Sequence, residues 1–114
     1  MKAVVKTKPG CGNLEWKEVR EPDYHPDLVK IEVKFAGICG TDLHIYHDTY
    51  KSYPPVIIGH EFSGIVVEAG EKVKHIRKGD RVTVLPSTAI TCGICAYCTT
   101  VQREIIYYAM TADH

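Results

Sequence analysis

The sequence predicts a small β-barrel with little helix. Short segments in which apolar and charged residues alternate recur along most of the chain, and turn residues separate them at short intervals. Strands at this density are typical of a barrel. The length of 114 residues suits one domain, and 45% hydrophobic with 25% charged residues indicates a globular rather than a disordered chain.

The charge balance gives no support for binding to nucleic acid or to a membrane surface. The 14 basic and 14 acidic residues cancel, whereas both of those roles need a basic face. No apolar run approaches the ~20 residues of a membrane span, and the N-terminal residues lack the apolar core of a signal peptide. Three of the five cysteines lie within TCGICAYC, which favours metal binding over disulfides and a reducing, cytoplasmic setting.

The first two strands are expected to form a hairpin. Residues 1–6 carry paired valines, residues 14–19 alternate apolar and charged side chains, and Pro9, Gly10 and Gly12 lie between them. Cys11 is interpreted as an ordinary turn thiol. A loop with two prolines follows at residues 21–27.

The clearest strand covers residues 29–35. Its apolar face is expected to carry Val29, Ile31, Val33 and Phe35, and its polar face Lys30, Glu32 and Lys34. The other lysines and glutamates are interpreted as solvated surface residues.

The middle of the chain alternates between short elements and turns. Thr41 is expected to cap a short helix over residues 42–46. The remaining elements are a loop at 50–55, an apolar run at 56–58, a strand at 64–69, and segments 73–76 and 81–85 on either side of a turn at 78–80. Residues 91–98 form a cysteine-rich loop, and residues 99–114 are expected to be helical, with Val101, Ile105 and Tyr108 on one face.

Cys39, His60 and Glu61 are candidate metal ligands. Zinc accepts thiolate, imidazole and carboxylate, and a catalytic zinc site keeps one position open for water or substrate. The alternative is a buried free cysteine, a loop histidine and a carboxylate that is solvated or lies behind a ligand. Composition alone favours that alternative, because the two loops must converge through folding.

Thr41 and His44 follow Cys39 closely. Beside a metal at Cys39, the Thr41 hydroxyl could hydrogen-bond an alcohol oxygen, and a neutral His44 could pass the proton to solvent. The alternatives are a helix cap for Thr41 and an exposed helical histidine for His44.

Cys92, Cys95 and Cys98 indicate a second metal site, since closely spaced thiols in a loop can converge on one ion. A closed zinc site needs four ligands, and Glu104, His114 or water are candidates for the fourth. An iron–sulfur cluster also needs four thiolates and is the weaker alternative. Gly10 and Gly12 do not make a dinucleotide fingerprint, because position 15 is Glu and a strand pattern follows.

Four motifs together resemble the zinc-dependent medium-chain alcohol dehydrogenase family, in particular its polyol and threonine dehydrogenase branch. Residues 1 to about 98 fit the family in order and spacing. The four motifs are GICGTDLH at 37–44, GHE at 59–61 followed by Gly64, Gly70 and Val73, KGDRV at 78–82, and CGICAYC at 92–98.

The resemblance implies a GroES-like, partly open β-barrel over residues 1–98 as the N-terminal catalytic domain, with the start of a structural-zinc lobe at 91–98. It implies Cys39 and His60 as catalytic zinc ligands, Glu61 as a ligand or near neighbour, and Thr41 and His44 as the proton relay. Cys92, Cys95 and Cys98 become structural zinc ligands. In the family, a Rossmann domain that binds NAD or NADP follows, and a small-molecule alcohol is oxidised.

The chain departs from the family pattern after residue 98. The fourth structural cysteine is expected near Ile106, and residues 99–114 read as a divergent tail. A further catalytic ligand and the cofactor domain are not in the sequence. We therefore expect a fragment truncated before the Rossmann domain, with weak or absent metal and no turnover alone. Its exposed apolar surface, including Ile105, Ile106, Tyr107 and Tyr108, predicts self-association or a homo-oligomer.

Two other functions stay open. One is a non-catalytic metal-binding or interaction module derived from the same family. The other, a chaperonin-like ring protein, rests on barrel topology alone and leaves the cysteine and histidine motifs without a role.

Overall fold

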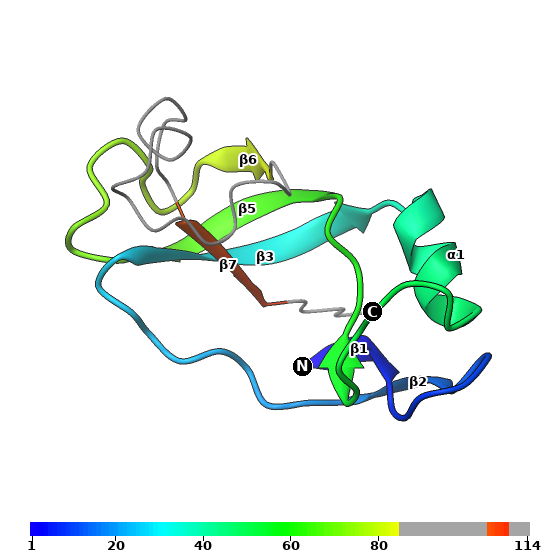
Figure 1. The fold of residues 1–114 in the computed structure, drawn as a ribbon. Helices are drawn as coiled ribbons and strands as arrows, with labels where there is room; N and C mark the ends of the chain where they lie inside the picture. Colours follow the sequence, from blue (N-terminus) through cyan, green and yellow to red (C-terminus); the bar gives the residue numbers. More distant parts are fainter. Residues whose placement is uncertain (85–104, 110–114) are drawn as a thin grey trace, which may run out of the picture.

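Two sheets dominate the fold of the computed structural model, which describes residues 1–84 and the backbone of 105–109 (Figure 1). The first sheet has the order β2-β1-β4 and the second β6-β5-β3-β7. Their bounds are β1 Lys2–Lys6, β2 Leu14–Glu18, β3 Leu28–Ala36, β4 Val56–Ile57, β5 Phe62–Ala69, β6 Arg81–Thr83 and β7 Ile105–Ala109. Among these residues there is one helix, α1, at Gly40–Tyr46. The expectation of a mostly β fold with little helix is confirmed.

The first sheet contains the predicted hairpin. Strands β1 and β2 pair antiparallel with Val4 opposite Trp16, and β4 pairs with the other edge of β1. Lys6 ends β1 and is completely buried, so the expectation that such lysines are solvated is wrong here. Its contacts belong to the connection between β1 and β2 and to the end of α1.

The second sheet carries the main hydrophobic core. Strands β3 and β5 pair antiparallel and place Val33 opposite Gly64. A Cβ atom at Gly64 would lie 2.1 Å from the backbone oxygen of Glu32, so a side chain there would push the strands apart. The buried core residues are Val29, Ile31, Val33, Phe62 and Val66.

The predicted apolar face of β3 is interrupted before its end. Its register against β5 shifts between Val33 and Phe35. Because such a bulge reverses the side on which the next side chain lies, Phe35 is 77% exposed instead of packing with Val33.

The helix expected over residues 99–114 is also corrected. Residues Ile105–Ala109 form β7, which runs parallel to β3 with Leu28 opposite Ile105. The sequence IIYYA is rich in β-branched and aromatic residues, which suit a pleated surface, and this preference outweighs the helical spacing.

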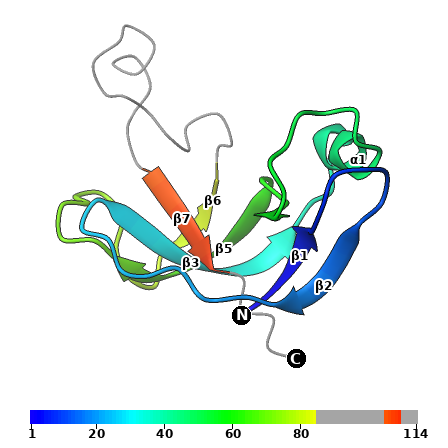
Figure 2. The ribbon, with the colours of Figure 1, turned by 60° about the horizontal axis from the view of Figure 1, so that its bottom comes forward.

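The helix α1 begins earlier than predicted. Cys39, not Thr41, occupies the position before its first turn, and the Asp42 carboxylate accepts a hydrogen bond from the Cys39 backbone N–H at 2.9 Å. Figure 2 shows α1 following the end of β3, close to the connection between β1 and β2. The described part of the chain contains no helix with the length and apolar character that a membrane crossing requires.

Candidate metal centre

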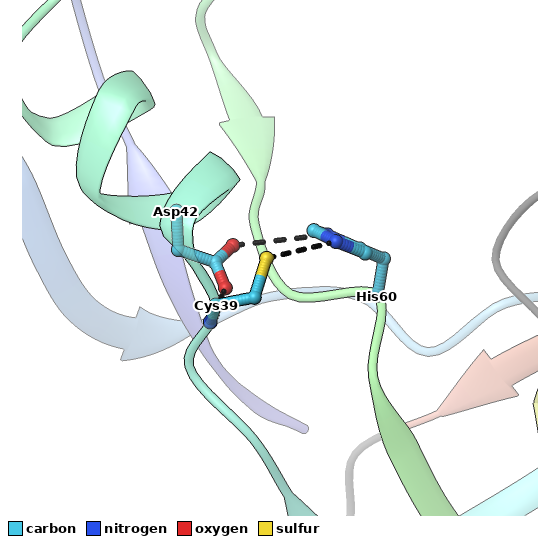
Figure 3. Close-up of side chains that lie close together, drawn as sticks. All are labelled: Cys39, Asp42 and His60. Atoms are coloured by element: carbon cyan, nitrogen blue, oxygen red, sulfur yellow. Dashed lines mark hydrogen bonds and ion pairs between the residues drawn. The ribbon is translucent and has the colours of Figure 1, made fainter.

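Cys39 and His60 meet although 21 residues separate them in the sequence. Cys39 lies between β3 and α1, and His60 lies between β4 and β5. The Cys39 Sγ atom is 3.1 Å from Nε2 of His60 (Figure 3). Both side chains are half-buried.

One backbone hydrogen bond joins the two segments, and a second attaches the His60 segment to β1. The Gly37 N–H donates to the Glu61 carbonyl at 2.7 Å, and the Ile58 N–H donates to Val4 in β1 at 3.1 Å. Gly59 has a φ of +101°, a conformation that other residues rarely adopt. Glycine at this position therefore allows the turn that brings His60 beside Cys39.

Asp42 is the third member of the group, a residue that the sequence motifs alone do not mark as a site residue. Its carboxylate is buried, and its Oδ1 atom lies 3.8 Å from Nδ1 of His60. Among the described residues, Asp42 Oδ1 is a buried side-chain oxygen that accepts no hydrogen bond. The sequence signal for Asp42 is its position three residues after Cys39, where an acidic residue commonly caps the N-terminus of a helix.

The three side chains offer a donor set that fits zinc. One ligand atom from each of Cys39, Asp42 and His60 lies within 4.8 Å of the others. A thiolate and an imidazole on one tetrahedral zinc ion are about 3.6 Å apart, given the usual bond lengths. The observed 3.1 Å between Sγ and Nε2 needs only a small adjustment. Asp42 lies nearest to Nδ1, so it can orient the ring while Nε2 faces the metal position.

Glu61, Thr41 and His44 lie around this group. Glu61 is exposed, and its carboxylate lies against Gly37, where a Cβ atom would be 3.5 Å from Oε2. Thr41 is half-buried on α1, one turn before the exposed His44, whose Nδ1 is 3.1 Å from the Thr49 hydroxyl. In residues 1–84, the group able to hold an ion consists of Cys39, Asp42 and His60 and does not include Glu61.

An apolar cavity of about 260 Å³ adjoins the group. Asp42 and His60 line it together with apolar residues that include Val33, Ile38, Leu43 and Phe62. The cavity can therefore present a small, mainly apolar molecule to the polar group. Cys92, Cys95 and Cys98 lie outside the described residues.

Comparison with known proteins decides the family. The profile of the alcohol dehydrogenase GroES-like domain matches residues 25–111. The chain belongs to this family. Together with the relatives, this places it among the zinc-dependent medium-chain alcohol dehydrogenases, as the sequence motifs predicted.

Three relatives are informative. The chain is 48% identical to a sorbitol dehydrogenase of Halalkalibacterium halodurans over 99 residues, which are 87% of this chain and 29% of the relative. A putative zinc-binding dehydrogenase of Sinorhizobium meliloti, solved with NADP, matches with 43% identity and a TM-score of 0.68, over 87% of this chain and 28% of that one. A thermostable alcohol dehydrogenase of Pyrobaculum aerophilum, solved with cobalt and zinc, matches with 36% identity and a TM-score of 0.73, over 88% and 30%. The chain thus spans less than a third of each relative.

Proposed function

We propose that this chain supplies the metal-binding, substrate-facing part of a zinc-dependent, NAD(P)-dependent alcohol or polyol dehydrogenase. The observation that carries the proposal is the meeting of Cys39 Sγ and His60 Nε2 at 3.1 Å beside a buried Asp42. The reaction is the oxidation of a secondary alcohol, which loses a hydride and a proton and becomes a ketone.

Cys39 and His60 would hold the zinc ion, and Asp42 would hold the His60 ring in the orientation that points Nε2 at it. Zinc, when bound, supplies Lewis-acid chemistry toward an oxygen. Glu61 belongs to the proposal as a ligand or a neighbouring charge, although its carboxylate lies against Gly37 in this conformation.

Thr41 and His44 would carry the proton. The Thr41 hydroxyl would hydrogen-bond the hydroxyl of the alcohol and take up its proton while passing its own onward. His44 is exposed on the same helix face, so it can release a proton to solvent, and its contact with Thr49 orients the ring. The hydride would leave from the carbon that bears the hydroxyl and pass to a nicotinamide.

The cavity and the relatives support the proposed substrate and cofactors. A small-molecule alcohol fits a mainly apolar cavity of about 260 Å³ whose lining includes Asp42, His60 and Glu61. NAD or NADP is the proposed hydride acceptor, and the Sinorhizobium meliloti relative was solved with NADP. Cys92, Cys95 and Cys98 are proposed to bind a structural zinc ion, and the cysteine pattern favours a cytoplasmic setting.

Alone, the 114-residue chain is expected to bind zinc weakly, to oxidise no alcohol and to self-associate. Zinc titration followed by an alcohol oxidation assay with NAD and NADP tests the first two expectations. Robust oxidation by the chain alone would contradict the proposal that it is one part of the catalytic unit.

A chimera tests the function itself. We would replace the matching segment of the Halalkalibacterium halodurans sorbitol dehydrogenase with residues 1–98 of this chain, and compare it with the same chimera carrying Cys39→Ser. The proposal predicts alcohol oxidation by the first chimera and none by the second. A folded, zinc-loaded chimera without activity would instead favour a non-catalytic metal-binding or interaction module.

A further inference from the structure

Lys6 has an unusual environment for a lysine. It is fully buried at the end of β1, and its Nζ atom donates hydrogen bonds to three backbone carbonyls. Two of these carbonyls, of Gly10 and Gly12, belong to the connection between β1 and β2, and the Gly12 distance is 2.8 Å. The third, 3.4 Å away, is that of Tyr46, the last residue of α1.

The partners of Lys6 account for all its donors. An ammonium group has three donors, and each has a carbonyl acceptor, while Oδ1 of Asp48 lies 3.9 Å from Nζ. A buried charge is costly to desolvate, and an apolar side chain of similar size would often stabilise the fold as well or better. Its directional bonds, unlike an apolar contact, fix where the end of α1 lies.

Other bonds join the same two segments. The Gly12 N–H donates to the Tyr46 carbonyl at 2.7 Å, and the Gly10 N–H donates to the Asp48 carboxylate at 2.9 Å. The residues after α1 are therefore attached to the hairpin at several points, and Lys6 is the buried centre of this attachment.

The backbone of Lys6 pairs with β4, the strand that precedes His60. Lys6 pairs with Val56 in β4, and Val5 pairs with Ile57. His60 follows β4 after two residues, and the Ile58 N–H still donates to Val4 of β1. The backbone at the end of β1 thus pairs with the segment that leads to His60. The Lys6 side chain bonds to the end of α1, the helix that follows Cys39 and contains Asp42.

We propose that Lys6 is a positioning residue for the metal centre. It fixes α1 relative to the His60 segment and thereby sets the spacing between Cys39, Asp42 and His60. The helix has seven residues, a length of about 10 Å. Because the helix is short and rigid, releasing the Tyr46 end allows it to tilt, and this tilt moves Cys39 and Asp42 away from His60. This role rests on the proposed metal function.

The test compares Lys6→Met with Lys2→Met in the full chain. Methionine keeps most of the length and apolar volume of lysine but has no donors, and Lys2 is an exposed residue of the same strand. Cobalt(II) is the probe, and the thiolate-to-cobalt absorption lost in Cys39→Ser isolates the signal of this centre. We expect Lys6→Met to lose affinity for cobalt at Cys39 relative to the parent, with a changed ligand-field spectrum. Lys2→Met should match the parent.

A merely stabilising role predicts a different result. If Lys6→Met lowers the melting temperature but, measured well below it, gives the same cobalt affinity and spectrum as the parent, the positioning role is wrong. Should Lys6→Met not fold, Lys6→Leu takes its place, because it likewise removes all three donors and leaves an apolar side chain at the buried position. Unchanged cobalt binding in that variant would equally overturn the proposal.

A metal-free readout separates this proposal from the proposed function. In the Lys6→Met chain, amide hydrogen exchange should become faster at Cys39 and His47, whose N–H groups donate to Asp42 and Leu43. If the parent shows no Cys39-dependent cobalt signal, the metal function fails, and the exchange data alone decide whether Lys6 positions α1. Unchanged exchange would reject the positioning role.

Discussion

The Cys39 thiol and the His60 imidazole face each other with Sγ 3.1 Å from Nε2, although Cys39 precedes α1 in the sequence and His60 follows β4. A backbone hydrogen bond from the Gly37 N–H to the Glu61 carbonyl joins the same two segments. This backbone bond helps to hold the Cys39 and His60 side chains close together.

Replacing Asp42 should weaken metal binding while preserving the fold. Asp42→Asn keeps an oxygen that can accept the Cys39 N–H bond but removes the charge facing Nδ1 of His60. We expect a loss of about 10-fold to 100-fold in zinc affinity, the usual effect of losing a carboxylate behind a histidine ligand. Competition titration with a chelator measures this loss. Asp23→Asn, at an exposed carboxylate paired with Arg20, is the control and should have no effect.

Glycine at position 64 should be required for the β3–β5 pairing. The Cβ atom of Gly64→Ala would lie 2.1 Å from the Glu32 carbonyl oxygen and 2.7 Å from Ile31, so the strands must separate. We expect the free energy of unfolding to fall by about 1–3 kcal/mol or more, as in other overpacked sites.

Urea denaturation compares Gly64→Ala with Gly40→Ala. A Cβ atom at Gly40 meets nothing within 4 Å, and alanine suits a helix better than glycine by up to about 1 kcal/mol. Equal midpoints for the two variants would show that the close approach at Gly64 is relieved without cost.

Exposed apolar side chains near the metal centre should promote self-association. Phe35 and Ile38 are 77% and 82% exposed, and both lie within four residues before Cys39 in the sequence. Light scattering should show a mass that rises with protein concentration, and Phe35→Ser with Ile38→Ser should reduce this rise. Tyr50→Ser changes a side chain that is 54% exposed and lies between α1 and β4, and it serves as the control. A monodisperse monomer at high concentration would count against association.

The local pattern of the sequence predicted most of the strands but not the details that build the site. Alternation correctly placed Val29, Ile31 and Val33 on the buried face, because apolar residues occur at every second position, which is the period of a strand. It failed at Phe35, since the bulge depends on pairing with β5 and leaves no mark in a single strand.

The residues of the metal centre were predictable to different degrees. Cys39 and His60 were identified through family motifs, because spacing alone does not show that two segments converge. Asp42 and Lys6 were missed: each stands in an element where an exposed charge is the ordinary interpretation, and only the tertiary structure buries it. Thr41 was assigned as the helix cap because hydroxyl residues favour that position, whereas the helix begins at Gly40.

The zinc-to-protein ratio, measured by elemental analysis after equilibration with excess zinc, tests most directly whether Cys39 and His60 share a metal ion. The parent chain is compared with Cys39→Ser and Cys95→Ser, so that the two proposed sites are separated. We predict that Cys39→Ser lowers the ratio and that Cys95→Ser lowers it by a separate amount. A ratio in Cys39→Ser equal to that of the parent would contradict a metal centre at Cys39 and His60.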